Sequence, residues 1–392
     1  MSAFLADWLN LLIRWGHMIA GIGWIGTSFY FIALDLSLKR REKMKDGVMG
    51  SAWEVHGGGF YHVEKFTVAP KELPDDLIWF KWEAYLTWLT GFLLLVVQFY
   101  LDADAWMIDP MVMRLEAWQA VAISVASLAV GWFVYDGICR SLIGERTTLL
   151  VVIGFIWILA ATYFYTQVFS GRSALIHVGA FIGTIMAANV FAVIIPNQRK
   201  ITEALLAGQP PDPKYGEIGK QRSTHNTYLT LPVLVTMVGG HYPMLSAHPQ
   251  AWLIVAFIII AGACMRHALV SHEVGEPFSG YRWTLPVILV ALFAAIWMTS
   301  PQQRDTSDLD VSDVQVMTIV QKHCIACHAT KPKNDAFEAP PKNMVLENID
   351  QLRRHSKQVA QFSVLTRAMP LGNETGMTDE ERRRLGAWID DQ

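Results

Sequence analysis

Charged residues are scarce in this sequence. Asp, Glu, Lys and Arg make up 17% of the 392 residues, while 52% are hydrophobic, and an average soluble domain carries about 25% charged residues. This composition excludes an ordinary soluble protein and predicts a membrane protein with a soluble appendage. The formal net charge of -3 is too small to indicate a nucleic-acid partner.

Cysteines are also few, and two of them have the spacing of a cofactor-binding site. Cys139 and Cys264 lie in apolar stretches, where free cysteines behave as small buried hydrophobic residues. Cys324 and Cys327 precede His328 in C-x-x-C-H, the attachment pattern of a c-type haem. A thioredoxin-like pair is an alternative, and a zinc site would need a second ligand pair that the sequence lacks. We predict one covalent haem c with His328 on the iron.

A cleavable signal peptide is not visible, because the first apolar stretch is too long for a signal segment and lacks a small-residue cleavage site. Runs close to the roughly 20 residues that cross a bilayer predict about eight spans. The sequence therefore predicts an all-α fold, a polytopic membrane helix bundle followed by a soluble C-terminal domain. The candidate spans are 8–37, 83–101, 117–138, 148–169, 172–196, 226–246, 250–269 and 283–299.

Basic residues are distributed very unevenly between the two sides of these spans. One set of alternating loops, counted together with Arg266, carries 17 Lys and Arg, whereas the opposite set carries only Arg114 and Arg172. Basic loops stay on the cytoplasmic side. We therefore predict that both chain termini lie on the periplasmic side of a bacterial inner membrane.

The chain changes character after residue 300. We divide it into a membrane domain (1–300), a polar linker (301–308) and a small domain (309–392). A first helix should end at the cysteine pair, and Thr378 with Glu381 predicts the capping box of a last helix, as in a cytochrome c domain. Met369, before Pro370, is the predicted second axial ligand, because the proline keeps its chain extended. Met377 competes, but should pack under the last helix.

Three segments carry a resemblance to a known family. They are "RWGHMIAGIGWIGTSFYF" (14–31), "EVHGGGFYHVEKF" (54–66) and "CIACH" (324–328), in this order. The chain resembles the bacterial membrane-bound urate hydroxylases, enzymes of purine catabolism with a fused cytochrome c. The resemblance implies oxidation of urate to 5-hydroxyisourate with oxygen from water. Electrons would leave through haem c to a respiratory-chain acceptor, a cytochrome c or a terminal oxidase. It implies no catalytic residues.

Histidines within the spans are candidate ligands of a second haem. His17, His177 and His241 are ionisable groups at membrane depth, where such groups are costly and usually functional. Facing imidazoles hold b-type haems in helix bundles, and Arg14 and Arg172 are placed to bind the propionates. Such a haem would relay electrons across about 30 Å of hydrocarbon from cytoplasmic urate. The alternative is that these histidines only hydrogen-bond neighbouring helices.

The loop 38–82 is the predicted substrate site. It is too long for a plain connection, and it offers aromatic faces, imidazoles, a cation and a carboxylate. Glu64 or a histidine would take the proton from the attacking water. The alternative is a tight glycine turn next to a basic run that lies on anionic membrane lipid. The candidates are His56, Phe60, Tyr61, His62, Glu64 and Lys65.

Two further functions remain open at this point. The first is a membrane haem protein that only carries electrons, from a quinol or a dehydrogenase to a terminal acceptor. The second is a metal-handling protein, which the 16 Met and 12 His suggest, but the Met residues form no repeated M-x-x-M clusters. His267 and His272 fit either a second redox centre or the interfacial end of a span.

Overall fold

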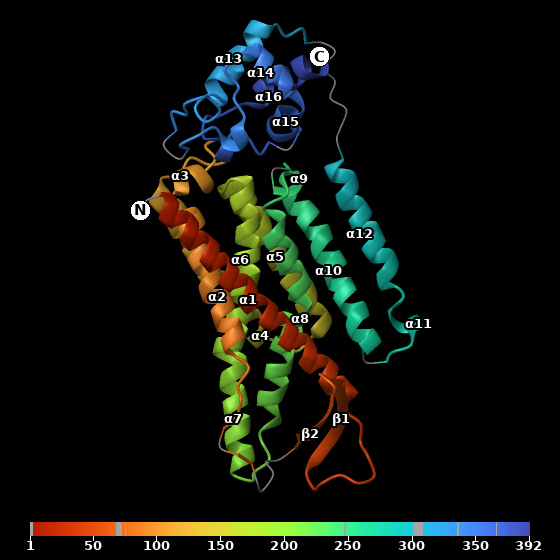
Figure 1. Cartoon of the computed structure of the whole chain (residues 1–392). Helices are drawn as coiled ribbons and strands as arrows, with labels where there is room; N and C mark the ends of the chain where they lie inside the picture. Colours follow the sequence, from red (N-terminus) through yellow and green to blue (C-terminus); the bar gives the residue numbers. More distant parts are fainter. Residues whose placement is uncertain are drawn as a thin grey trace.

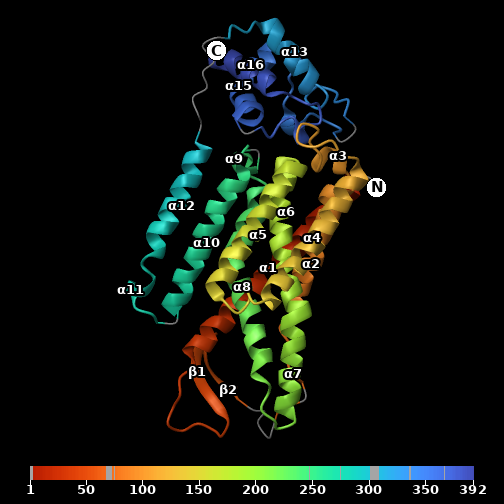
Figure 2. The same cartoon turned by 180° about the vertical axis from the view of Figure 1, so that it is seen from behind.

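The protein is a bundle of long helices with a smaller helical unit at one end (Figure 1). The computed structural model describes residues 3–67, 73–74, 76–246, 248–273, 275–300, 309–334, 337–365 and 367–392. The predicted linker 301–308 lies outside the described residues. The N-terminus and the C-terminal unit lie at the same end of the bundle in both views (Figures 1 and 2).

The long helices follow one another with short connections. The bundle consists of α1 (Ala3–Ser37), α2 (Trp82–Leu95), η1 (Val96–Tyr100), α3 (Ala103–Trp106), α4 (Ala117–Arg140), α5 (Thr147–Val168), α6 (Gly171–Ala188), η2 (Asn189–Ile194), α7 (Ile195–Leu206), α8 (Pro213–Gly239), α9 (Pro243–Ser246), α10 (Ala251–Glu273), α11 (Phe278–Tyr281) and α12 (Thr284–Thr299). The segments η1 and η2 are π-helical, and each continues the helix before it.

The predicted spans agree with these helices within a few residues, except at two places. The span predicted at 172–196 continues to Leu206, because η2 joins α6 and α7 into one helix. The span predicted at 226–246 belongs to a helix that begins at Pro213, which Asp212 caps through its side chain. In the described part of the chain, seven helices are long and apolar enough to cross a membrane, and α8 is not among them because its first half is polar.

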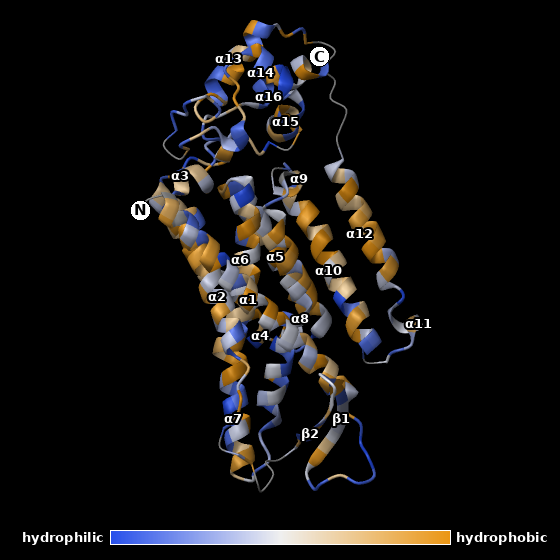
Figure 3. Ribbon diagram, viewed as in Figure 1, coloured by the Kyte–Doolittle hydropathy of each residue, from blue (hydrophilic) through white to orange (hydrophobic). Residues whose placement is uncertain are grey.

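The hydropathy of the helices is banded along the bundle. The middle of α5, α10 and α12 is hydrophobic, while α7 and the C-terminal unit carry many hydrophilic residues (Figure 3). This pattern is consistent with a membrane-associated bundle whose two ends lie in water.

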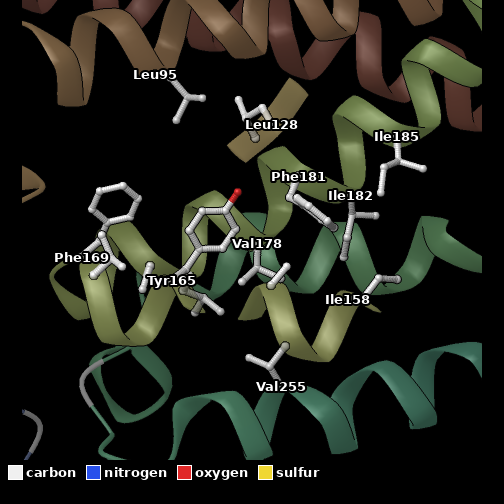
Figure 4. Packing of buried hydrophobic residues seen from close by; sticks show 14 of the residues in the cluster. Leu95, Leu128, Ile158, Tyr165, Phe169, Val178, Phe181, Ile182, Ile185 and Val255 are labelled. Carbon is white, nitrogen blue, oxygen red and sulfur yellow. The ribbon is translucent and has the colours of Figure 1, made fainter. Parts of the chain in front are cut away.

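Helix α6 is the centre of the bundle. It packs against α2, α4, α5 and α8, and more of it is buried than of any other candidate span among the described residues. Its Phe181 ring packs on the Tyr165 ring of α5, with centroids 6.2 Å apart, and Phe169 stacks on Tyr165 at 6.0 Å (Figure 4). The central helix therefore holds the side chains that can be shielded from lipid.

The all-α prediction is wrong for one segment. β1 (Val48–His56) and β2 (Gly59–Phe66) form an antiparallel hairpin at the end opposite the C-terminal unit. Gly57 and Gly58 both have positive φ, which a two-residue hairpin turn requires. The strands are rich in aromatic and β-branched residues that favour extended chain. The expected glycine turn is thus present, but it joins strands.

The C-terminal unit is a separate small core. It consists of α13 (Asp313–His323), η3 (Pro341–Asn343), α14 (Ile349–Arg354), α15 (Ser356–Val359), η4 (Ala360–Leu365), η5 (Leu371–Asn373) and α16 (Asp379–Asp390). The first helix ends at the cysteine pair, as expected, and Thr378 and Glu381 form the predicted capping box of α16. Both helices pack together, and Trp388 Nε1 donates to Asp313 Oδ1 at 2.8 Å.

Candidate functional site

The C-x-x-C-H segment forms a turn directly after α13. His328 donates its Nδ1 hydrogen to the Met344 carbonyl oxygen at 3.0 Å, and the amide of Leu346 donates to the His328 carbonyl at 2.8 Å. A histidine held in this way presents Nε2 as the free acceptor, the arrangement found in metal-binding imidazoles. In the described part of the chain Nε2 makes no hydrogen bond. His328 is therefore oriented as a ligand.

The two thiols are unpaired in this turn, and neither has a disulfide. Burial raises the pKa of Cys324 to about 12, and burial also raises the pKa of Cys327. Both side chains therefore stay protonated at neutral pH. A thioredoxin-like pair needs a thiolate with a lowered pKa, so the local environment argues against that alternative.

Met369 lies in the segment that joins η4 to η5, and one arginine secures it. The Met369 amide donates to the Phe362 carbonyl at 2.9 Å. Arg382, from α16, donates to the carbonyl oxygens of Met369 (2.6 Å) and Ser363, and to Asn373 Oδ1 (3.1 Å). Burial lowers the pKa of Arg382 to about 10, which leaves it charged at neutral pH.

The donor set fits a covalent c-type haem. Two free thiols stand at the required spacing, an adjacent imidazole has a free nitrogen, and the half-buried Met369 lies in the segment that joins η4 to η5. Met377, in contrast, is 2% exposed and packs in the core of the C-terminal unit, as predicted. Across the described ranges, no three His, Cys, Asp or Glu gather as metal ligands.

The segment after Met369 rests on the bundle. η5 contacts α3, and a Cβ added to Gly372 would lie 2.5 Å from the Ala105 carbonyl oxygen. Asn373 Nδ2 approaches Asp109 Oδ1 at 3.5 Å. Desolvation by burial raises the pKa of Asp109. The segment that carries the candidate ligand thus seats the C-terminal unit on the helical bundle.

We expect Gly372→Val to loosen this contact. The added side chain would collide with backbone atoms of α3, which cannot rotate away, so amides of residues 103–109 should exchange hydrogen roughly 10-fold faster. Hydrogen-exchange mass spectrometry of the full-length protein measures this. Gly376→Val is the matched control, because Gly376 also has positive φ but its Cβ would meet nothing within 4 Å. Equal exchange in the two variants would contradict the contact.

His17 has the hydrogen bonding of a ligand, and His177 does not. His17 Nδ1 lies 2.9 Å from the Thr87 carbonyl oxygen of α2, and its Nε2 has no hydrogen-bond partner among the residues that the structure describes. His177 is fully buried, with Nδ1 2.7 Å from the Ser173 carbonyl and Nε2 2.7 Å from Ser124 Oγ. Both nitrogens of His177 are therefore engaged, and the pair does not fit two axial ligands in this arrangement.

The other residues predicted around a b-type haem gather at the end that faces the C-terminal unit. Arg14, Arg172 and His241 are close enough to repel one another electrostatically. Arg172 also lies over the Trp106 ring at 5.1 Å. A b-type haem stays a prediction, which extraction of the full-length protein with acidified acetone tests, since a covalent haem is not extracted.

The hairpin divides the predicted substrate residues between its two faces. His56 and Lys65 lie on one face with Tyr61, while His62 and Glu64 lie on the other with Phe60. Lys65 pairs with Asp35 (2.7 Å), and Glu64 pairs with Lys45 (2.8 Å). His62 stacks on Trp53, with ring centroids 4.3 Å apart. Within one chain these residues therefore do not converge on a common site, and their catalytic role stays a prediction.

The structure brings together buried polar residues that the sequence pattern did not single out. Arg222, 2% exposed, donates to Asp136 Oδ1 at 2.7 Å and approaches Asn189 Oδ1 at 3.5 Å. Tyr135 bonds His225 at 2.6 Å beside it. The sequence pattern indicated Arg222 only as one of the basic loop residues. The polar run at the start of α8 was the feature that could have indicated a buried polar network there. In this network Arg222 Nη2 is paired with Asp136, while Arg222 Nε has no hydrogen-bond partner among the described residues.

A second buried arginine, Arg266 of α10, has no such partners. It is 0% exposed and lies against the Phe29 ring of α1, with Cζ 3.9 Å from the centroid. Its neighbour His267 bonds Tyr228 Oη at 2.8 Å, and Trp283 covers the imidazole at 5.5 Å. His267 is thus part of a packed cluster between α8 and α12, rather than a free interfacial residue.

Comparison with known proteins identifies the class of protein. The family model described as urate oxidase N-terminal matches residues 3–300, the whole helical bundle with its hairpin. The chain belongs to this urate oxidase N-terminal family, which places it among oxidoreductases that act on urate in purine catabolism. Searches of curated proteins and of solved structures found no match to the chain.

Proposed function

We propose that the protein oxidises urate to 5-hydroxyisourate within its membrane bundle and passes the electrons to a haem c in its C-terminal unit. The family match over residues 3–300 is the observation that carries the substrate. The C-x-x-C-H turn with an oriented His328 supports the electron acceptor. In full, urate and water give 5-hydroxyisourate, two protons and two electrons.

Four residues of the C-terminal unit would bind the haem. Cys324 and Cys327 would hold the haem through thioethers, and His328 and Met369 would bind its iron. A c-type haem would supply a one-electron acceptor, so the first electron of each turnover would have to pass on to a respiratory-chain acceptor before the second is taken up. Arg382 and the Phe362 carbonyl keep Met369 in place.

The contact between η5 and α3 supports transfer between the two units of one chain. Gly372 and Asn373, a few residues after Met369, touch the 103–109 segment of the bundle. Ser170, which precedes α6, bonds the carbonyls of Trp106 and Met107 in that segment. We propose that electrons enter the C-terminal unit through this junction.

The decisive experiment is reduction of the haem by urate. In purified full-length protein without oxygen, urate should convert the ferric c-type spectrum to the ferrous one. Water labelled with heavy oxygen should label the product. A haem that urate leaves ferric but a quinol reduces would favour the alternative electron carrier.

The side of the membrane follows from the basic loops. We propose that the C-terminal unit lies in the periplasm of a bacterial inner membrane, which agrees with the unequal distribution of Lys and Arg. Protease added to intact spheroplasts should then release a fragment that stains for haem. Release only from inverted vesicles would reverse the assignment.

A further inference from the structure

Arg266 carries two hydrogen-bond donors that the fold leaves unused. Its side chain is 0% exposed, and neither Nε nor Nη2 has a hydrogen-bond partner among the residues that the structure describes. These two nitrogens form one edge of the guanidinium, where both N–H bonds point the same way in one plane. That edge is the fork with which arginine binds two adjacent acceptor atoms.

An unpaired buried charge is unfavourable, so it indicates a function rather than a packing role. A buried ion without a partner loses its hydration without compensation. Contact with the Phe29 ring recovers only part of that loss. Glu273 acts on Arg266 electrostatically, but within the described ranges no carboxylate lies within 4 Å of its nitrogens.

Arg222 shows what a structural arginine looks like at the same end of this bundle. It is equally buried, and its Nε also has no hydrogen-bond partner among the described residues. Its terminal nitrogens, however, form an ion pair with Asp136 at 2.7 Å and approach the Asn189 amide oxygen. The fold can therefore supply partners to a buried guanidinium on α8. On α10, in contrast, the fold places the Phe29 ring against Arg266 and gives its Nε and Nη2 no hydrogen-bond partner among the described residues.

We propose that the Nε and Nη2 fork of Arg266 binds the urate anion. This inference rests on the proposed function and names the substrate site within it. At neutral pH urate is a planar monoanion, and its deprotonated ring nitrogen and the adjoining carbonyl oxygen are two in-plane acceptors that match the fork. A ligand bound in this way lies in the guanidinium plane, beside the Phe29 ring and the hydroxyl of Tyr228.

The position of Arg266 suits a substrate that comes from the cytoplasm. It lies seven residues before the end of α10, which at 1.5 Å per residue is about 10 Å. That end is the one opposite the C-terminal unit (Figures 1 and 2). Helices α1, α8 and α10 each contribute a residue, so the site would depend on the assembled bundle.

The test compares three variants of the full-length protein. Arg266→Gln removes the charge, Arg266→Lys keeps the charge without the fork, and Arg282→Gln removes an exposed charge at the same end. Apparent KM for urate, from haem reduction, should rise about 100-fold in Arg266→Gln and nearly as much in Arg266→Lys. Arg282→Gln should match the wild type.

Binding and stability are measured separately from electron transfer. Equilibrium dialysis with radiolabelled urate should show saturable binding that both Arg266 variants lose. Without urate, the thermal midpoint of Arg266→Gln should equal or exceed that of the wild type, because a buried unpaired charge is gone. Urate should raise the midpoint of the wild type and of Arg282→Gln only.

The outcomes separate this inference from the proposed function. Wild-type KM and urate binding in Arg266→Lys would overturn the inference and leave the function intact. Urate binding that depends on Arg266, without any reduction of the haem, would support the site and overturn the function. A midpoint that falls steeply in both Arg266 variants, with urate binding kept in Arg266→Lys, would make the arginine structural and refute the site.

Discussion

Replacement of Cys324 and Cys327 by alanine should abolish covalent haem and urate turnover together. Without either thiol no thioether can form, and His328 alone, held by Met344, would have to retain the haem. We expect no haem staining after denaturing electrophoresis and at least ~1000-fold less urate-dependent electron transfer, since the chain would lose its electron acceptor.

The control replaces the other two cysteines. Cys139 is buried in the core of the bundle and Cys264 is half-buried on α10, and neither lies near the C-terminal unit. Cys139→Ala with Cys264→Ala should retain staining and most turnover. Urate turnover at the wild-type rate in the Cys324/Cys327 variant would show that electrons leave by another route.

Arg382→Met should release the Met369 segment. The substitution removes hydrogen bonds to the carbonyls of Met369 and Ser363 and to Asn373, and it leaves these acceptors buried. We expect the C-terminal unit to lose about 3–5 kcal/mol of stability, the usual effect of breaking a buried charged network. The sulfur-to-iron band in the near infrared should weaken or vanish, while the covalent haem remains.

Two further variants serve as controls for Arg382→Met. Arg384→Met alters an exposed arginine on the same helix that pairs with Glu380 at 2.9 Å, and it should change stability by less than about 1 kcal/mol. Met369→Ala should lose the near-infrared band without the large loss of stability. A band that persists in Met369→Ala would exclude this residue as the ligand, and Met377 would then be the next to test.

Features that depend on neighbours in the chain were predictable. The apolar runs located the bundle helices, because a span must cover the hydrocarbon thickness with consecutive residues. The capping box of Thr378 and Glu381 and the end of α13 at the cysteine pair follow from backbone groups that only nearby side chains can satisfy. The hairpin was missed, although its glycine turn was expected, since two short strands need each other to form.

Contacts between distant segments were not predictable in this way. Arg382 holds Met369 from 13 residues away, and Gly372 meets Ala105 across the junction of the two units. The hairpin separates His56 and Lys65 from His62 and Glu64 because successive residues of a strand face opposite sides. Because these residues are close in the sequence, we had expected them to form one substrate site, but the strand geometry places them on two faces of the hairpin.

The sequence by itself determined that the chain forms helices long and apolar enough to cross a membrane and ends in a unit with C-x-x-C-H, since hydrophobic length and local spacing suffice for both. Only the tertiary structure decided which buried polar groups are satisfied. His177 has both nitrogens bonded, Arg222 has Asp136, and Arg266 keeps an unused fork. The type of a residue determines which hydrogen bonds and ion pairs its side chain can form. Its partners lie on other helices, so the packing of the helices determines which of these bonds form.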